Sequence, residues 1–225
     1  MDLNDFVDAV RSTAPKPKLQ RRMGTIVAIN SSYSVNVKVA GSTTTITNVR
    51  YFAHYAPKVN TQVWLDTDGK DWIAIGAVAG LGGQVPTAKV YLNAAQTIAT
   101  GATFTGVLWN ATEFDPWGMY TSGSANVVVP ITGRYLVTGQ CSWLGNNTGY
   151  RTAVLQHSNG TTNFAYTQVD AGTANQFSLS VSSVRTASVG ESFSLQVRQG
   201  SGANLDLISG LSYTQMTVTY LGPAA

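Results

Sequence analysis

Hydrophobic and polar residues alternate with a period of two through most of this chain, which is the pattern of half-buried β-strands. Between residues 23 and 79 the alternation occurs in about five short runs, and Val35, Val37 and Val39 form one of them. Turn sequences separate the runs, and Asp68-Gly69 is a strong hairpin signal. Short strands in a segment of about sixty residues close most simply into a small barrel, because closure removes the exposed sheet edges.

The first residues follow a helical period instead. Apolar side chains recur there at the spacing of one helix face, behind acidic residues that suit a helix N-terminus. These apolar residues are Leu3, Phe6, Val7 and Val10. We therefore predict a short amphipathic helix and then a proline-rich spacer, together residues 1–22. Because so short a helix is marginal on its own, we expect its apolar side chains to anchor the chain on a neighbouring protein.

After the glycine-rich segment around residues 80–83, strand-like runs recur at regular intervals as far as Tyr220, without a helical stretch between them. That pattern is typical of a β-sandwich. The prediction is therefore an all-β chain with a short N-terminal helix. Its parts are a five-stranded barrel over residues 23–80, a linker over 81–87 and a sandwich over 88–225.

Charge is distributed unevenly between the two β units. Residues 1–83 contain nine Lys/Arg and six Asp/Glu, whereas residues 84–225 contain five of each. Nucleic-acid binding needs basic side chains gathered on one face, and those of the second unit are scattered along its sequence, so we expect no nucleic-acid partner. The sequence has no apolar run of about 18 residues, so we expect no membrane insertion.

Two further features bear on where the protein acts. Cys141, the single cysteine, lies within an alternating run and is expected to be a small buried hydrophobic residue. Acidic residues stand where a signal peptide would have basic ones, so we expect synthesis in the cytoplasm without a signal peptide. Assembly into a virus particle that lysis releases is one route by which such a protein leaves its cell.

The barrel region resembles a known family. The stretches VNVKVAG, VRYFAHYAPKVNTQVWL and DWIAIGAVAG, between residues 35 and 80, are similar to the small barrel of the oligosaccharide/oligonucleotide-binding type found in phage tail and baseplate proteins. The marks are Pro57 and Val59 before the fourth strand and Ile75-Gly76 at the close of the fifth. The resemblance implies a role in attachment to other phage tail proteins.

The second unit resembles the globular heads of complement proteins. The order of a strand, a proline and a Gly-x-Tyr motif in residues 114–137 is similar to that family, and so are the Asn-Gly hairpin after Val154 and the turn at Gly190. The resemblance implies a ten-stranded jelly roll of the complement and tumour-necrosis-factor type that forms a homotrimer. By position in that family, the implied trimer interface consists of Tyr135, Phe193, Met216, Val218 and Tyr220.

Together the two units resemble a minor tail or tail-fibre protein of a bacteriophage. The resemblance implies a virion protein whose N-terminal helix is a virion anchor and whose trimeric head binds a glycan or protein on the host cell. A capsid fibre or decoration protein is the alternative within the same particle. A polysaccharide depolymerase is a less favoured alternative from another class, because the second unit is poor in acidic residues.

Aromatic residues flanked by small polar ones are the candidate receptor-binding residues, because loops of this kind stack aromatic rings on sugars. The candidates are Trp117, Tyr120, Tyr150 and Tyr166. Burial in the core is the alternative for each of them.

Acidic residues offer two candidate chemistries. Asp66, Asp68 and Asp71 could hold calcium, although the loop spacing favours a plain hairpin turn, and this question stays open. Glu113 and Asp115 could form a glycosidase pair, but the Asp115-Pro116 step indicates a turn. The two histidines lie in different units without metal-ligand neighbours. We therefore expect no catalytic residues, no cofactor and no metal.

Overall fold

The computed structural model describes residues 19–31, 33–52, 55–78, 85–158, 163–171 and 175–224. Every regular element within these ranges is a β-strand, which confirms the all-β prediction. The chain divides into two compact units, Met1–Gly82 and Gly83–Ala225. The predicted N-terminal helix with Leu3, Phe6, Val7 and Val10 lies outside the described residues.

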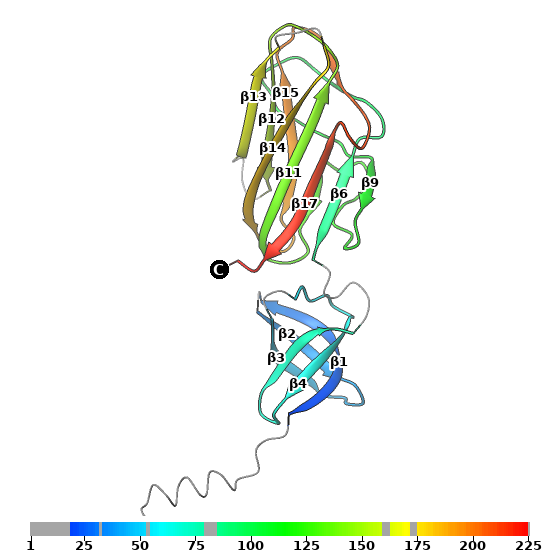
Figure 1. The fold of residues 1–225 in the computed structure, drawn as a ribbon, viewed down its shortest axis with the longest axis vertical. Coiled ribbons are helices and arrows are strands. Elements are labelled where there is room, and N and C mark those ends of the chain that lie inside the picture. Colours follow the sequence, from blue (N-terminus) through cyan, green and yellow to red (C-terminus); the bar gives the residue numbers. More distant parts are fainter. Residues whose placement is uncertain are drawn as a thin grey trace, which may run out of the picture. The chain divides into compact units, whose positions relative to one another are not determined.

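The first unit is a small β-barrel. Its strands are β1 (Gln20–Ser31), β2 (Ser34–Val39), β3 (Thr45–Tyr51), β4 (Gln62–Thr67) and β5 (Trp72–Ala77). They close in the order β1-β2-β3-β5-β4, which confirms the predicted five-stranded barrel (Figure 1). All neighbouring strands pair antiparallel except β3 and β5, which pair in parallel at Arg50–Ile73 and Tyr51–Ala74.

The barrel core follows from the alternation in the sequence. Val35, Val37 and Val39 of β2 all point inward and are buried, together with residues of the other four strands. Gly24 of β1 faces the same core, and a Cβ there would lie 2.5 Å from Cγ1 of Val37 and 2.8 Å from Cδ1 of Leu65. A side chain at residue 24 would therefore have to displace the core side chains of Val37 and Leu65.

The second unit is built from shorter and longer strands. They are β6 (Thr87–Tyr91), β7 (Gln96–Ile98), β8 (Thr105–Gly106), β9 (Ala111–Phe114), β10 (Asn126–Val128), β11 (Gly133–Trp143), β12 (Tyr150–His157), β13 (Asn163–Asp170), β14 (Phe177–Ala187), β15 (Ser192–Gln199), β16 (Leu205–Leu207) and β17 (Gln215–Gly222). This set of described strands is larger than the predicted ten. Four of them, β7, β8, β10 and β16, have only two or three residues, which is too short for an alternation with a period of two to reveal.

These strands form two sheets of a sandwich (Figure 1). The five-stranded sheet has the order β10-β15-β12-β13, with β8 beside β15. The seven-stranded sheet has the order β7-β16-β11-β17-β6-β9, with β14 beside β11. Long antiparallel ladders between β11 and its neighbours β14 and β17 make the centre of this second sheet.

Large aromatic side chains fill the space between the two sheets. Trp109, Trp143, Tyr135 and Phe193 are all fully buried there. The ring of Tyr135 lies 5.9 Å from that of Phe193 and 5.3 Å from that of Tyr220, measured between centroids. The Tyr135 hydroxyl donates a hydrogen bond to the carbonyl oxygen of Ile131 at 2.6 Å. The core is therefore packed, and the Tyr135 hydroxyl is satisfied.

This packing bears on the trimer interface that the family resemblance implied. Its five members, Tyr135, Phe193, Met216, Val218 and Tyr220, are all at most 5% exposed within a single chain. Side chains enclosed by their own protomer offer no surface to another one. Side chains alternate between the two faces of a strand. The residues adjacent in sequence to Tyr135 on β11, and to Met216, Val218 and Tyr220 on β17, therefore point away from the core.

Burial also makes a prediction about Cys141. Its thiol is fully buried in β11, and burial raises the pKa of this thiol to about 12. At pH 8 the thiolate fraction is then on the order of 10⁻⁴. We expect a chromogenic disulfide reagent to leave the native protein unlabelled for hours and to label the urea-unfolded protein within minutes. Rapid labelling of the native protein would contradict the buried position.

Candidate ligand-binding face

The two chain ends of the second unit lie at one end of its sandwich. The backbone N–H of Tyr220 donates to the carbonyl oxygen of Pro86 at 2.9 Å. Strand β11 runs from this end to the opposite one, where the loop before β12 begins (Figure 1). At that opposite end, which we call the distal end, the N–H of Gly101 donates to Gln199 and the N–H of Gly200 donates to Tyr150.

The outward side of the five-stranded sheet carries polar and aromatic residues near the distal end. Strand β12 lies between β13 and β15, so that Thr152 is opposite Gln168 on one side and Arg198 on the other. Tyr150 lies two residues before Thr152, and Tyr166 lies two residues before Gln168, so both share this side of the sheet. We call Phe104, Tyr150, Thr152, Tyr166, Gln168 and Arg198 the distal face.

Arg198 lies between two aromatic rings of the distal face. Its Cζ atom is 4.7 Å from the ring centroid of Phe104 and 5.4 Å from that of Tyr150, which are cation–π distances. The same guanidinium donates to the carbonyl oxygen of Ala102 at 3.4 Å and to Oγ1 of Thr152 at 3.5 Å. Arg198 therefore joins the loop before β8 to the sheet.

Glycine allows Tyr150 to take its position. A Cβ at residue 200 would lie 2.6 Å from Cε1 of the Tyr150 ring, so any larger residue there would displace this ring. The Tyr150 hydroxyl reaches the carbonyl oxygen of Gly101 at 3.4 Å. The ring is thus held by two glycine-containing loops and is only partly exposed.

Tyr166 and Gln168 form the more exposed part of the distal face. The Tyr166 side chain is 54% exposed. Its hydroxyl donates to Oε1 of Gln168 at 2.5 Å, and the Thr152 hydroxyl donates to the same oxygen at 3.1 Å. With Oε1 fixed in this way, the amide NH₂ of Gln168 is oriented and makes no hydrogen bond within the described part of the chain.

The candidate receptor-binding residues thus fall into two separate groups. Tyr150 and Tyr166 share the distal face. Trp117 and Tyr120 lie in the connection between β9 and β10, where both are partly buried and the Tyr120 hydroxyl donates to the carbonyl oxygen of Trp109. Sequence reasoning missed Arg198, and it also missed Phe104.

The residues of the proposed glycosidase pair have structural partners. The Asp115 carboxylate accepts hydrogen bonds from the N–H groups of Met119 at 2.8 Å and Tyr120 at 2.9 Å. The Glu113 carboxylate pairs with the Lys89 ammonium group at 2.7 Å. Asp115 therefore closes the turn that the Asp-Pro step indicated, and the arrangement does not support a catalytic pair.

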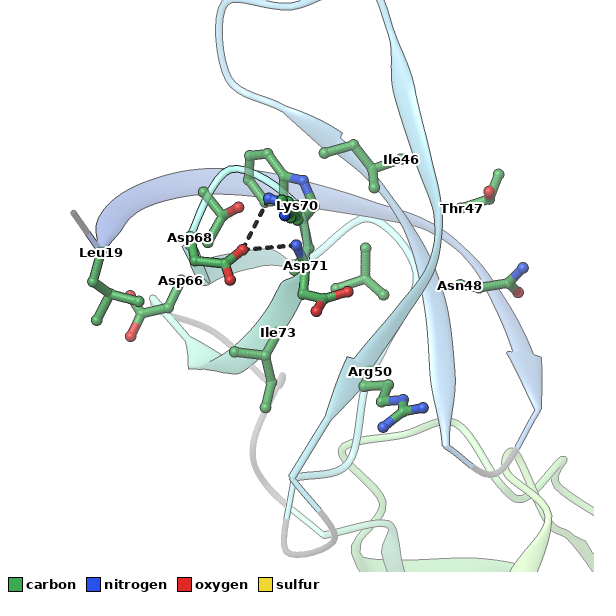
Figure 2. Close-up of a pocket in the computed structure, with 13 residues that line it drawn as sticks. Leu19, Ile46, Thr47, Asn48, Arg50, Asp66, Asp68, Lys70, Asp71 and Ile73 are labelled. Carbon is green, nitrogen blue, oxygen red and sulfur yellow. Dashed lines mark hydrogen bonds between the residues drawn. The ribbon is translucent and has the colours of Figure 1, made fainter. Parts of the chain in front are cut away.

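A hollow of about 660 Å³ lies in the barrel between β3 and the turn that joins β4 to β5 (Figure 2). Asp66 at its edge pairs with Arg21 at 2.9 Å, and this hydrogen bond lowers the pKa of the Asp66 carboxyl group. Oδ1 of Asp68 accepts the N–H groups of Lys70 at 2.9 Å and Asp71 at 2.8 Å, which lowers the pKa of Asp68.

Asp66 and Asp68 therefore bind other parts of the chain, as the hairpin interpretation requires. Gly69 completes the turn with a φ of +93°. No cluster of His, Cys, Asp or Glu with the geometry of a metal site occurs among the residues that the structure describes. Within the same residues, no helix is both long and apolar enough to cross a membrane.

Comparison with known proteins places the fold. No family model and no curated protein matches the chain. Murine APRIL at pH 5.0 is similar with a TM-score of 0.50 and 13% identity, over 61% of this chain and all of that one. Eiger TNF from S. frugiperda is similar with a TM-score of 0.44 and 16% identity, over 63% of this chain and 95% of that one. The globular domain of zebrafish complement 1qA is similar with a TM-score of 0.45 and 14% identity, over 60% of this chain and 96% of that one.

At such identities the likeness concerns the fold alone. It agrees with the two-sheet sandwich described above and with the resemblance noted in the sequence. The chain therefore combines a small closed barrel with a jelly-roll sandwich whose fold is similar to that of murine APRIL.

Proposed function

We propose that this chain is a virion protein of a bacteriophage tail tip or tail fibre, and that it acts as a homotrimeric receptor-binding head without enzymatic activity. The distal face carries this proposal. It lies at the end of the sandwich opposite Pro86 and Tyr220, so a head that is held by its N-terminal side presents the face outward.

The chemistry of the distal face suits a glycan. An exposed ring such as that of Tyr166 packs against the CH groups of a pyranose, and the oriented amide of Gln168 donates to sugar hydroxyls. Single sites of this kind bind weakly. Three copies on one head raise the effective concentration of the second and third sites, which increases avidity by factors of roughly 10² or more.

We place the proposed trimer interface on the outward side of the seven-stranded sheet, because the five residues that the family resemblance implied are buried within one chain. Leu136 is 37% exposed there, and Val184, its partner on β14, is 53% exposed. Leu221 on β17 adds a third exposed apolar side chain to the same side, at 51%. Exposed apolar side chains that lie together across neighbouring strands mark a protein contact, and a second and third copy of the head are the proposed partners.

The remaining parts of the proposal concern attachment. Residues 1–22, with the anchor candidates Leu3, Phe6, Val7 and Val10, and the barrel would bind other phage tail proteins. The sequence features that support this are the apolar stripe of the first residues and the tail-type resemblance of the barrel. A capsid fibre or decoration protein would use the same parts on the capsid surface.

Labelling of phage particles tests the location. An antibody against residues 84–225 is expected to bind at the tail tip when particles that carry this chain are viewed by electron microscopy. Labelling at the capsid surface would favour the decoration protein. Purified particles that lack the chain altogether would contradict both.

Cell binding tests the recognition role. Fluorescent full-length protein is expected to stain host cells, and Tyr166→Ala should reduce the staining by about tenfold because the ring is the exposed platform. Tyr33→Ala removes a tyrosine of similar exposure, 52%, from the barrel and is the matched control. Equal staining by wild type and Tyr166→Ala would show that recognition does not use the distal face.

A further inference from the structure

The distal face carries one basic side chain, Arg198. The other basic residues of the second unit are placed elsewhere: Lys89 pairs with a glutamate, and Arg151 is fully buried. Arg134 and Arg185 lie in adjacent strands at the opposite end of the sandwich. A ligand at the distal face therefore meets Arg198 as its source of positive charge.

No carboxylate of the described residues forms an ion pair with Arg198. Asp170 is the acidic residue on the same side of the sheet, where it lies opposite Tyr150. Its carboxylate is not within ion-pair distance of the Arg198 guanidinium. The positive charge is thus available to a ligand. Arg151 differs, because three of its hydrogen bonds reach backbone carbonyl oxygens inside the unit.

Arg198 is also held in one orientation. The rings of Phe104 and Tyr150 fix the guanidinium, while its two hydrogen bonds, at 3.4 and 3.5 Å, are long. A guanidinium has five N–H donors in a planar fork that matches the two oxygens of an oxyanion. The Arg198 guanidinium is therefore preorganised for an oxyanion, and some of its N–H donors are free to bind one. Because the side chain is already held in place, little of its conformational entropy is lost on binding.

The spacing between Arg198 and the sugar-binding side chains fits an oligosaccharide. Arg198 and Gln168 are one strand to either side of Thr152, which sets their backbones about 10 Å apart. Tyr166 is two residues from Gln168 along β13, or about 7 Å. A ligand that reaches all three must therefore be longer than a single sugar ring.

We propose that the distal face binds an acidic oligosaccharide. Arg198 holds a carboxylate or phosphate oxyanion of the ligand, Gln168 donates to a sugar hydroxyl, and Tyr166 packs against a sugar ring. This inference rests on the proposed function and specifies the chemical class of the receptor.

Titration calorimetry on the full-length protein tests the proposal with three probes. They are an oligogalacturonate, its carboxyl-reduced neutral counterpart and a phosphodiester-linked hexose oligomer. We expect the protein to bind one acidic probe about 10- to 100-fold more tightly than the neutral one, which is the usual contribution of a hydrogen bond to a charged group. The preferred acidic probe distinguishes a uronic acid from a phosphate-bearing glycan.

Variants assign the charge selectivity to Arg198. Arg198→Gln is expected to abolish the preference for the acidic probe, while Arg198→Lys should restore only part of it, because lysine keeps the charge but lacks the planar fork. Arg185→Gln removes a cation from the opposite end of the sandwich and is the matched control. Circular dichroism of each variant identifies any loss of fold, and Tyr166→Ala, which leaves Arg198 in place, should weaken binding of acidic and neutral probes alike.

Three results would overturn the inference: no binding of either acidic probe, equal binding of the neutral probe, or an unchanged preference in folded Arg198→Gln. If Arg198→Gln nevertheless stains host cells as strongly as wild type, the receptor-binding function stands and only its acidic ligand is rejected. If wild type stains no host cell but binds an acidic probe through Arg198, the receptor-binding function fails and the inference stands.

Discussion

Replacing Tyr135 with aspartate is expected to unfold the second unit, whereas the same replacement at Leu136 is expected to leave it folded and to dissociate the trimer. Tyr135 is fully buried, and its ring packs against Phe193 and Tyr220. An aspartate there would leave a cavity, an unsatisfied Ile131 carbonyl oxygen and an unpaired buried charge. The expected loss is about 5 kcal/mol or more, which is comparable to the whole stability of a domain.

Leu136 follows Tyr135 on β11 and points to the other side of the sheet, where it is 37% exposed. A carboxylate at this position stays in water as long as the protomer is alone, so the fold should be retained. In the proposed trimer the same carboxylate would be transferred to an apolar contact with Val184 and Leu221, at a cost of several kcal/mol.

Light scattering gives the mass of each variant, and near-ultraviolet circular dichroism reports the packing of the buried tryptophans Trp109 and Trp143. We expect a trimer for wild type, a folded monomer for Leu136→Asp and no native signal from these tryptophans for Tyr135→Asp. A trimeric Leu136→Asp would place the interface elsewhere. A natively folded Tyr135→Asp would contradict the buried position of the tyrosine.

The contrast between these neighbours also shows what sequence alone can predict. The alternation from Tyr135 to Trp143 predicted a strand with one apolar side, and the structure confirms it. An apolar strand face can be buried against the second sheet of the same chain or against another protomer. The alternation is the same in both cases, because either contact excludes water from that face. The five residues that the family resemblance implied are covered by their own protomer, so the proposed interface uses their outward-facing neighbours instead.

The distal face was predictable only in part, for a similar reason. Tyr150 and Tyr166 lie on the two strands of one hairpin. Each was predicted from the small polar residues that flank it in the sequence. Arg198 and Phe104 come from β15 and from the loop before β8, and it is the pairing of β12 with β15 that brings them beside Tyr150. No local pattern encodes a contact between segments so distant in the sequence.

Gly149→Ala is expected to damage the fold and the distal face together. Gly149 has a φ of +71°, and a Cβ there would lie 1.8 Å from the carbonyl oxygen of Gly200 and 2.5 Å from its carbonyl carbon. These are backbone atoms, which cannot rotate away as the end of a side chain can, so one of the two loops must move. We expect a loss of stability on the order of 3–5 kcal/mol.

Gly202→Ala is the matched control at the same end of the sandwich. Gly202 has a φ of +83°, but a Cβ there would have no atom within 4 Å. The control therefore carries the conformational cost of an alanine in the left-handed region, about 1–2 kcal/mol, without the collision. Urea unfolding of both variants, followed by tryptophan fluorescence, should separate the two costs. Equal losses would mean that the close approach of the two loops does not exist.

The same pair of variants connects the loops to recognition. Gly200 lies beneath the Tyr150 ring, and that ring holds Arg198, so a displacement of Gly200 is transmitted to the guanidinium. We expect Gly149→Ala, under conditions where it is still folded, to lose host-cell staining, and Gly202→Ala to keep it. Full staining by folded Gly149→Ala would show that recognition does not depend on the position of Tyr150 and Arg198, because the substitution removes no side chain from the face itself.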